Sequence, residues 1–283
     1  MVIATWNVNS VRARKERLLA WLAAHRPDVL CLQELKVVRD DFPWEEVRAA
    51  GYETVGAFQP TYNGVAILSR LPMADVVEGL GDGEDDPQAR LVAATIWPGH
   101  AGAVDGPRKE TADGAGVASV PRDGGVRVVC VYVPNGQEPD SDKFQYKLRW
   151  LDRLEAWLRR TTRPGERVIV CGDFNIVPRD LDAHDAAAWR GTVLLNPEVR
   201  GRLAALEGTG LVDVVARRHP EGGPFSWWDY RMLGFPKNHG LRIDLVLASP
   251  AQADRCIDAF TDRDQRKGEK PSDHAPVVVT FRD

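Results

Sequence analysis

Short runs of apolar residues recur along the chain at the length of a β-strand. Most are rich in valine and isoleucine, whose branched side chains pack well on a pleated sheet. Many are bounded by Gly, Pro, Asn or Asp, which favour turns at strand ends. The predicted strands cover residues 2–6, 29–32, 65–68, 91–97, 126–133, 168–171, 243–247 and 277–281.

Two segments instead place apolar residues three or four positions apart, the period of an amphipathic α-helix. Residues 14–24 carry Leu18, Leu19 and Leu22 on one face. Residues 143–160 carry an apolar stripe with Arg and Lys opposite, and the stripe comprises Phe144, Leu148, Leu151, Leu154 and Leu158. Strands mixed with fewer helices predict an α/β sandwich with mixed sheets.

Polar side chains gather at the ends of the predicted strands. They are Asn7, Glu34, Tyr132, Asn135, Asp173, Asn175, Asp244, Asp273 and His274. Strand ends in a sandwich can converge on one edge, where loops leave the core and a pocket opens. We therefore expect these side chains to meet in one site.

Asp273 and His274 form the most unusual pair among them. They lie between Pro271 and Pro276, directly before an apolar strand. Proline fixes its own φ and biases the preceding residue toward extended geometry, so this turn is stiff. Taken alone, the stretch fits a turn that merely starts a strand equally well.

Residues 99–125 interrupt the pattern. They are dense in Gly, Pro, Asp and Ala, with almost no large apolar residue, and lie between two predicted strands. We expect a long, flexible surface insertion in a hairpin. Because no linker separates two apolar cores, we expect residues 1–283 to form a single domain.

Composition narrows the classes of protein that fit. Hydrophobic residues make up 43% of the 283 residues, enough for a large core. The net charge of −4 shows no basic excess, although a bound cation can still bring a polyanion to carboxylates. The four cysteines form no C-x-x-C pair, which argues against zinc and thioredoxin-like sites. With no apolar run of about 18 residues, we expect no membrane span and a reducing, cytoplasmic compartment.

The polar set has the chemistry of a hard-cation site. Glu34, Asn7 and Asp273 offer oxygen ligands, which suit Mg²⁺ or Mn²⁺. Asp244 can hold the tautomer of His274. Asp173 can orient an attacking water molecule, and Asn175 and Tyr132 can donate hydrogen bonds to the reacting group.

Direct attack by water is favoured over a covalent intermediate, because no serine, cysteine or lysine is placed as an activated nucleophile. Metal-assisted phosphodiester hydrolysis fits these roles best. Individually, Asn7 and Asn135 are typical of turns, and residues 172–175 are typical of an Asx turn. The hypothesis depends on one reaction that uses every member of the set.

Eight stretches together resemble the exonuclease III family of apurinic/apyrimidinic (AP) endonucleases, within the wider endonuclease/exonuclease/phosphatase fold. Jointly they span the chain apart from residues 99–125. They are TWNVNSVRAR at 5–14, DVLCLQELK at 28–36, NGVAILSR at 63–70, YVPNG at 132–136, GDFNIVP at 172–178, FSWWDYR at 225–231, GLRIDLVLAS at 240–249 and KPSDHAPV at 270–277.

The resemblance implies a four-layer α/β sandwich, with two mixed β-sheets packed face to face and helices outside. It implies Glu34 and Asn7 as the principal metal ligands with Asp273 nearby; a second metal site at Asp173, Asn175 and His274 stays open. It further implies roles in catalysis: water activation or leaving-group protonation by Asp173, transition-state stabilisation by Asn175, phosphate contact by His274 with Asp244, and an active-site tyrosine at Tyr132. Whether Asp173 or His274 is the base stays open.

The same resemblance implies how an abasic nucleotide is recognised. Trp227, Leu241 and Ile243 match an apolar pocket for a flipped, base-less sugar, with a plain core role as the alternative. An abasic site has already lost its stacking, so extruding it costs less, and a pocket without base-edge donors rejects intact nucleotides. Lys36, Asn135 and Lys143 are expected to contact DNA phosphates.

We therefore expect a Mg²⁺- or Mn²⁺-dependent DNA repair nuclease, acting as a monomer on double-stranded DNA with abasic sites or blocked 3′ ends. It should hydrolyse the phosphodiester 5′ to abasic sites and act as a 3′→5′ exonuclease and 3′-phosphatase/phosphodiesterase. One alternative is a phosphodiesterase of the same superfamily acting on RNA or a phospholipid head group. Another is a non-catalytic DNA-binding module, against which the intact Glu34, Asp173, Asp244 and His274 argue.

Overall fold

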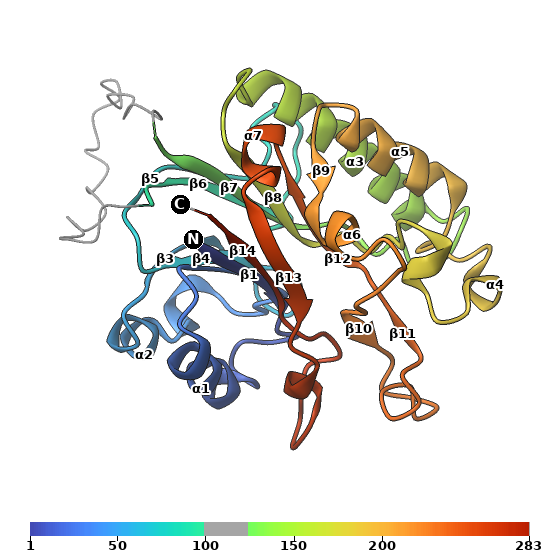
Figure 1. Ribbon diagram of the computed structural model, residues 1–283, viewed down its shortest axis with the longest axis horizontal. Helices are drawn as coiled ribbons and strands as arrows, with labels where there is room; N and C mark the ends of the chain where they lie inside the picture. Colours follow the sequence, from blue (N-terminus) through green and yellow to red (C-terminus); the bar gives the residue numbers. More distant parts are fainter. Residues whose placement is uncertain (99–123, 283) are drawn as a thin grey trace.

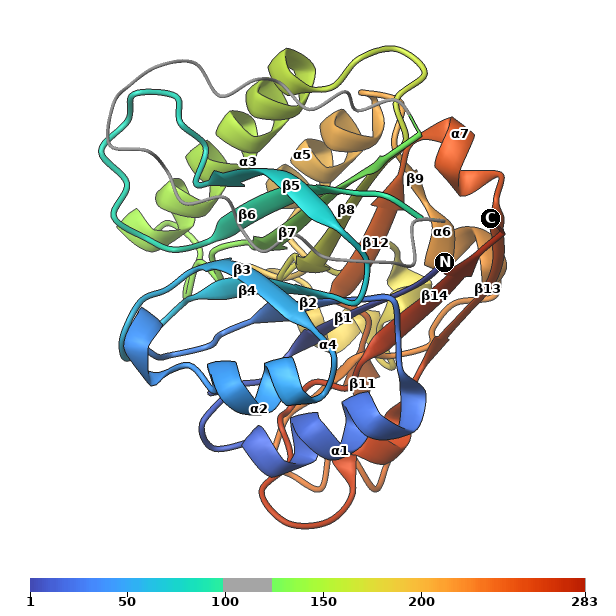
Figure 2. The same ribbon diagram turned by 90° about the vertical axis from the view of Figure 1, so that its left-hand side faces the viewer.

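Two mixed β-sheets pack face to face, with helices on their outer faces, in a computed structural model that describes residues 1–98 and 124–282 (Figure 1). Figure 2 shows the four layers edge-on, with α1 (Lys15–His25) and α2 (Trp44–Ala49) below one sheet and α3 (Asp142–Thr161) and α5 (Pro197–Glu207) above the other. The fold class expected from the sequence is confirmed. The insertion expected at 99–125 lies outside the described residues, apart from its last two positions.

The first sheet has six strands in the order β13-β14-β1-β2-β4-β3. Its β1–β2 pair is parallel, and the other pairs are antiparallel. The strands are β1 (Val2–Asn7), β2 (Val29–Gln33), β3 (Glu53–Ala57), β4 (Val65–Ser69), β13 (Cys256–Thr261) and β14 (Val277–Phe281).

The second sheet has six strands in the order β5-β6-β7-β8-β12-β9. Its β7–β8 pair is parallel, and β12 runs antiparallel to β8. The strands are β5 (Met73–Glu78), β6 (Leu91–Ile96), β7 (Val126–Tyr132), β8 (Val168–Asp173), β9 (Val212–Asp213) and β12 (Asp244–Ala248). A separate two-stranded ribbon joins β10 (Trp227–Trp228) to β11 (Gly240–Leu241).

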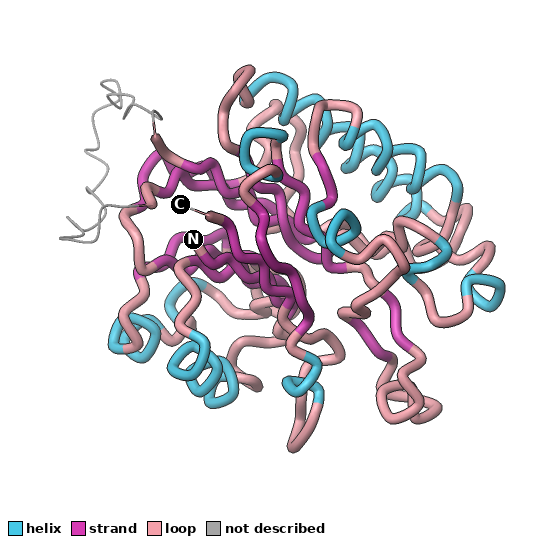
Figure 3. The backbone as a smooth tube through the Cα atoms, in the orientation of Figure 1, coloured by secondary structure: helices cyan, strands magenta, loops and turns pink. Residues whose placement is uncertain are grey.

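Helices α1 and α2 cover the outer face of the first sheet, and α3 and α5 cover that of the second (Figure 2), because each of these four turns an apolar side inward. Figure 3 shows the helices in cyan around the magenta strands. On α1, Leu18, Trp21 and Leu22 are buried against the first sheet. The described helices are α1 (Lys15–His25), α2 (Trp44–Ala49), α3 (Asp142–Thr161), α4 (Ala186–Trp189), α5 (Pro197–Glu207), α6 (Val214–Arg218) and α7 (Pro250–Ala253), with short 3₁₀ turns at η1 (Arg39–Asp41), η2 (Asp180–Asp182) and η3 (Arg263–Arg266). Within residues 1–98 and 124–282, none of them is long and apolar enough to cross a membrane.

The core between the two sheets is built from the strands that the apolar runs predicted. It contains Cys31, Cys130 and Cys171, all free and buried, as expected for small apolar side chains. Within the described residues, six strands were not predicted: the sheet edges β3, β5, β9 and β13, and the ribbon strands β10 and β11. The longer edge strands have half-exposed side chains, such as Ile257 and Phe260 on β13, and β9, β10 and β11 are each two residues long, so their apolar signal is weak.

Candidate active site

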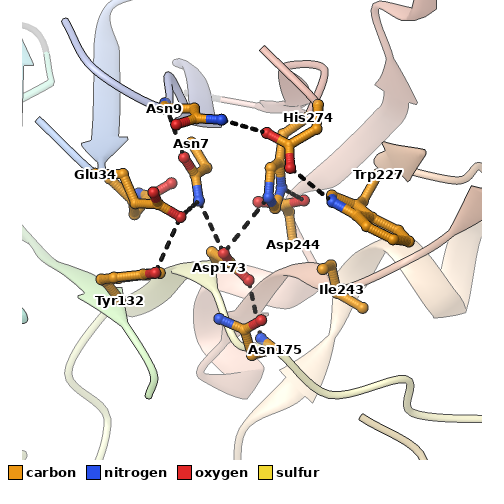
Figure 4. A network of polar contacts seen from close by, with 12 residues as sticks. Asn7, Asn9, Glu34, Tyr132, Asp173, Asn175, Trp227, Ile243, Asp244 and His274 are labelled. Carbon is orange, nitrogen blue, oxygen red and sulfur yellow. Dashed lines mark hydrogen bonds and ion pairs between the residues drawn. The ribbon is translucent and has the colours of Figure 1, made fainter. Parts of the chain in front are cut away.

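The predicted site residues converge because the two parallel strand pairs end at the same edge of the sandwich. Asn7 ends β1, and Glu34 follows β2 directly. In the second sheet, Asp173 ends β8 and lies in register with Tyr132 on β7 and Asp244 on β12. Figure 4 shows these side chains pointing toward one another from both sheets.

His274 lies between two buried carboxylates. Its Nδ1 is 2.8 Å from Asp244 Oδ2, and its Nε2 is 3.7 Å from Asp173 Oδ2. Burial by itself lowers the pKa of His274, but the charges of Asp244 and Asp173 outweigh it and raise that pKa to about 10. The imidazole is therefore a cation at neutral pH, with Nδ1–H directed at Asp244.

Asp173 is buried, and burial is the main reason that its pKa rises to about 7, against the lowering charge of His274. Asn7 Nδ2 donates to Asp173 Oδ2 at 2.9 Å and to Glu34 Oε1 at 2.8 Å. A carboxyl group with this pKa can accept a proton near neutral pH, which is what a general base requires.

Glu34 is held by three side chains. Its Oε1 accepts hydrogen bonds from Asn7 and, at 2.9 Å, from the Tyr132 hydroxyl. Its Oε2 lies 2.7 Å from Lys36 Nζ. Burial raises the pKa of Glu34, but Lys36 and Asn7 reverse that effect and the pKa is lowered overall. The pKa of the Tyr132 hydroxyl, in contrast, is raised well above its usual value by burial and by the neighbouring carboxylates.

Asn9 is a site residue that the sequence did not indicate, and the contacts of Lys36 with Asn9 and Glu34 were not expected either. Lys36, for which a contact with DNA phosphates stays a prediction, donates to Asn9 Oδ1 at 2.7 Å and pairs with Glu34. Asn9, Glu34, Lys36 and Asn175 all have positive φ angles between 45° and 55°. Non-glycine residues seldom adopt this conformation outside functional or tightly constrained sites.

Asn175 and Asn135 are hydrogen-bonded to each other beside Asp173. Asn135 Nδ2 donates to Asn175 Oδ1 at 2.9 Å, and Asn175 Nδ2 donates to the Val133 carbonyl at 3.0 Å. The backbone N–H of Asn175 donates to Asp173 Oδ1 at 2.9 Å. The two asparagines are thus tied to the same turn as Asp173.

Lys147 is a further residue that the sequence analysis missed. Its Nζ is buried and donates to the carbonyls of Asn135, Asn175 and Val193 at 3.1, 2.6 and 3.0 Å. The available signal was its position, because a lysine between Phe144 and Leu148 falls on the apolar stripe of α3. Lys143, one turn earlier, is exposed.

Of the three residues expected to line the lesion pocket, only Trp227 is partly exposed. Trp227 is half-buried and packs edge-to-face on Trp189, with ring centroids 5.8 Å apart. Leu241 and Ile243 are buried in the core of the second sheet, beneath the indole. Asp273, expected near the metal, accepts from Asn9 Nδ2 and from Trp227 Nε1, each at 3.0 Å.

The charges of the side chains in this site fit a bound divalent cation. In the described part of the chain this network has two cationic side chains, Lys36 and His274, against four carboxylates, those of Glu34, Asp173, Asp244 and Asp273. Asp244 Oδ1 is buried without a hydrogen-bond partner. Asp173, Asp244 and His274 form a buried group whose ligand atoms lie within 4.8 Å of one another. An excess of buried negative charge with oxygen donors suits a hard cation.

Comparisons with known proteins agree with this geometry. Residues 4–274 match the Endonuclease/Exonuclease/phosphatase family. The chain is 32% identical to exodeoxyribonuclease III of Haemophilus influenzae, over 100% of both chains. Among solved structures, it is similar to the 3′ phosphatase NExo from Neisseria bound to a product DNA hairpin (38% identity, TM-score 0.88) and to an AP endonuclease from Archaeoglobus fulgidus (34% identity, TM-score 0.87), each over 100% of both chains.

Proposed function

The chain belongs to the exonuclease III/AP endonuclease family of DNA repair nucleases, and from this premise we propose that it hydrolyses the phosphodiester 5′ to abasic sites in duplex DNA. We propose that it also removes nucleotides and phosphates from 3′ ends, since an exodeoxyribonuclease and a 3′ phosphatase are among its full-length relatives. The observation that best supports hydrolysis is the buried Asp173 carboxylate, shared between Asn7 and the cationic His274.

Mg²⁺ or Mn²⁺ is the proposed cofactor. Glu34 and Asn7 would hold it, with Asp273 close by through Asn9, and a second ion at Asp173, Asn175 and His274 is an alternative. The bound cation supplies charge neutralisation on the scissile phosphate. Side-chain rotation at Asn7 would turn its Oδ1, which now accepts from the Asn9 N–H, toward the ion.

Asp173 is the proposed general base. It would take a proton from the attacking water as the water oxygen bonds to phosphorus. The bond from phosphorus to the 3′-oxygen would break, and that oxygen would take up a proton from solvent to form the 3′-hydroxyl group. The His274 imidazolium, held by Asp244, would donate from Nε2 to a phosphoryl oxygen. Asn175 and Tyr132 would donate to the charge that develops on the pentacoordinate phosphorus group.

Recognition of the abasic nucleotide is proposed for Trp227, with Leu241 and Ile243 forming the apolar wall behind it. Asn135, which donates to Asn175, and Lys143 are both exposed and would contact DNA phosphates. Lys36 would contact them from its position beside Glu34. We further propose that the chain acts as one domain and as a monomer.

The experiment that tests the proposal is cleavage of a duplex with one tetrahydrofuran abasic analogue, with and without chelator. We expect metal-dependent nicking 5′ to the analogue, and loss of nicking in Glu34→Ala. Glu84→Ala is the matched control, because Glu84 is an exposed glutamate whose side chain lies on the surface loop before β6. Cleavage of RNA or a phospholipid analogue without nicking of the abasic duplex would favour the alternative phosphodiesterase. Binding of the duplex without turnover would favour a non-catalytic module.

A further inference from the structure

The segment that carries Trp227 and the turn that carries Asp273 form one hydrogen-bonded frame. The Trp228 N–H donates to the Asp273 carbonyl at 3.0 Å, and the Ala275 N–H donates to the Ser226 carbonyl at 2.8 Å. Trp227 and His274 form a β-bridge between these two hydrogen bonds. The backbone therefore places the pocket indole beside the catalytic turn.

The Asp273 side chain adds a bond that sets the orientation of the indole. Its Oδ2 accepts from Trp227 Nε1 at 3.0 Å, as Figure 4 shows. The indole is half-buried and packs on Trp189 at one edge. Without the hydrogen bond, only this packing would oppose rotation of the ring about χ2.

The other oxygen of Asp273 connects the indole to the proposed metal ligand. Asp273 Oδ1 accepts from Asn9 Nδ2 at 3.0 Å, Asn9 Oδ1 accepts from Lys36 Nζ at 2.7 Å, and Lys36 pairs with Glu34. The Asn9 amide is oriented at both ends, with its oxygen toward an ammonium and its nitrogen toward a carboxylate. Each oxygen of Asp273 is thus used by a neutral N–H donor.

We propose that Asp273 is a positioning residue for substrate selection, which holds the Trp227 indole in the orientation that admits a base-less sugar. This inference rests on the proposed nuclease function and refines it. It assigns Asp273 to the lesion pocket and leaves the cation to Glu34 and Asn7. Each Asp273 oxygen keeps a second lone pair, so the Mn²⁺ measurement below tests a direct ligand role separately.

A double-mutant cycle separates the two roles. Trp227→Phe keeps an aromatic ring but removes the indole N–H, Asp273→Ala removes the acceptor, and the double variant removes both. The readout is the ratio of kcat/KM for nicking the tetrahydrofuran duplex to kcat/KM for removing a 3′-phosphate. Trp44→Phe is the matched control, because Trp44 Nε1 also donates one hydrogen bond, to the Arg39 carbonyl on the far side of the first sheet.

We expect each single variant to lower this ratio by about tenfold, the scale of one charge-assisted hydrogen bond, and the double variant to lower it no further. Affinity for Mn²⁺, measured by electron paramagnetic resonance without DNA, should change less than about twofold in either single variant. Two multiplying losses would overturn the proposal, as would an unchanged ratio with much weaker Mn²⁺ binding in Asp273→Ala.

Two further comparisons keep the outcomes distinct. If Asp273→Ala does not fold, Asp273→Asn takes its place in the cycle, because the amide retains one acceptor oxygen and should lose part of the selectivity. Failure of the wild-type protein to nick the abasic duplex would refute the proposed function itself. Retention of nicking with no coupling between Asp273 and Trp227 would refute only this inference.

Discussion

Replacing Asp244 by asparagine should remove the main support for the positive charge on His274. Asp244 Oδ2 lies 2.8 Å from His274 Nδ1, and both side chains are buried, so water cannot replace the lost charge. Asparagine has nearly the same shape, which makes Asp244→Asn mainly an electrostatic change. Asp173, 3.7 Å from Nε2, would remain the nearest carboxylate.

The size of the effect follows from the pKa of His274, which rises from 6.5 to about 10. That rise corresponds to about 5 kcal/mol, and Asp244 is the largest of the groups that produce it. Losing about half of this energy would bring the pKa of His274 in the variant to about 8. The same change should lower the pKa of Asp173, because the charge of Asp244 raises it.

The assay is kcat/KM for nicking the abasic duplex between pH 6 and pH 9.5, at fixed cation concentration. If Asp173 must be deprotonated and His274 protonated, wild-type activity rises through about pH 7 and stays high to the end of the range. In Asp244→Asn both limits should move to lower pH, and activity should fall above about pH 8. Asp82→Asn is the control, since Asp82 pairs with Arg153 on the surface.

A direct measurement completes this test. Nitrogen-15 NMR of the His274 ring in the presence of chelator should show an imidazolium at pH 8 in the wild type and mostly neutral imidazole at pH 9 in the variant. An unchanged alkaline limit in Asp244→Asn, or a neutral His274 in the wild type at pH 7, would refute the reasoning.

Three further predictions concern the buried polar groups that hold the site in place. Arg242→Met should lower the free energy of unfolding in urea by roughly 3–5 kcal/mol, because the buried guanidinium lies 2.8 Å from Asp182 and 2.7 Å from Asp213. Asp213 would lose its cation, and Asp182 would keep only Arg179; a loss below about 1 kcal/mol would contradict this. Burial raises the pKa of Asp182, but hydrogen bonds from Arg179 and Arg242 outweigh it and lower that pKa from 3.8 to about 2. The ionised carboxylate therefore stabilises the fold by about 2 kcal/mol above pH 3.8, and this stabilisation is lost as the pH falls through about 2. The difference in the free energy of unfolding between wild type and Asp182→Asn, measured in urea, should shrink from about pH 5 to about pH 2, and a constant difference would count against the prediction. Lys147→Met should leave three backbone carbonyls without their donor, which costs about 1–3 kcal/mol of stability for each carbonyl that stays buried. It should also lower kcat for nicking of the abasic duplex. A full kcat in a folded variant would show that the loops of Asn135 and Asn175 do not need this lysine.

Much of the fold could be predicted because it depends on local pattern. The central strands read as continuous apolar runs since both of their faces are buried between a sheet and a helix layer. The amphipathic pattern of residues 143–160 predicted the bounds of α3 to within one residue at each end. The edge strands β5 and β13 were missed because exposure on one side weakens their apolar pattern.

The sequence also predicted that polar residues at the strand ends would meet, because one reaction could use the whole set although several members are individually typical of turns. Asn7, Glu34, Asp173, Asp244 and His274 do meet. Their partners were not predictable. Lys36 contacts Glu34, and Lys147 contacts three backbone carbonyls. Which residues meet at these points depends on how the loops pack in the folded chain.

The sequence by itself determined the sandwich, the family and the kinds of side chain at the strand ends, since periodicity and residue type are local properties. Only the tertiary structure decided what each side chain faces. The register of β8 with β12 sets Asp173 opposite Asp244, and the packing of one sheet on the other brings Asn7 and Glu34 to them. The bridge between Trp227 and His274 turns the Asp273 carboxylate toward the indole. Burial at that shared edge raises the pKa of Asp173, and the carboxylates that the fold brings there raise the pKa of His274 against the effect of burial.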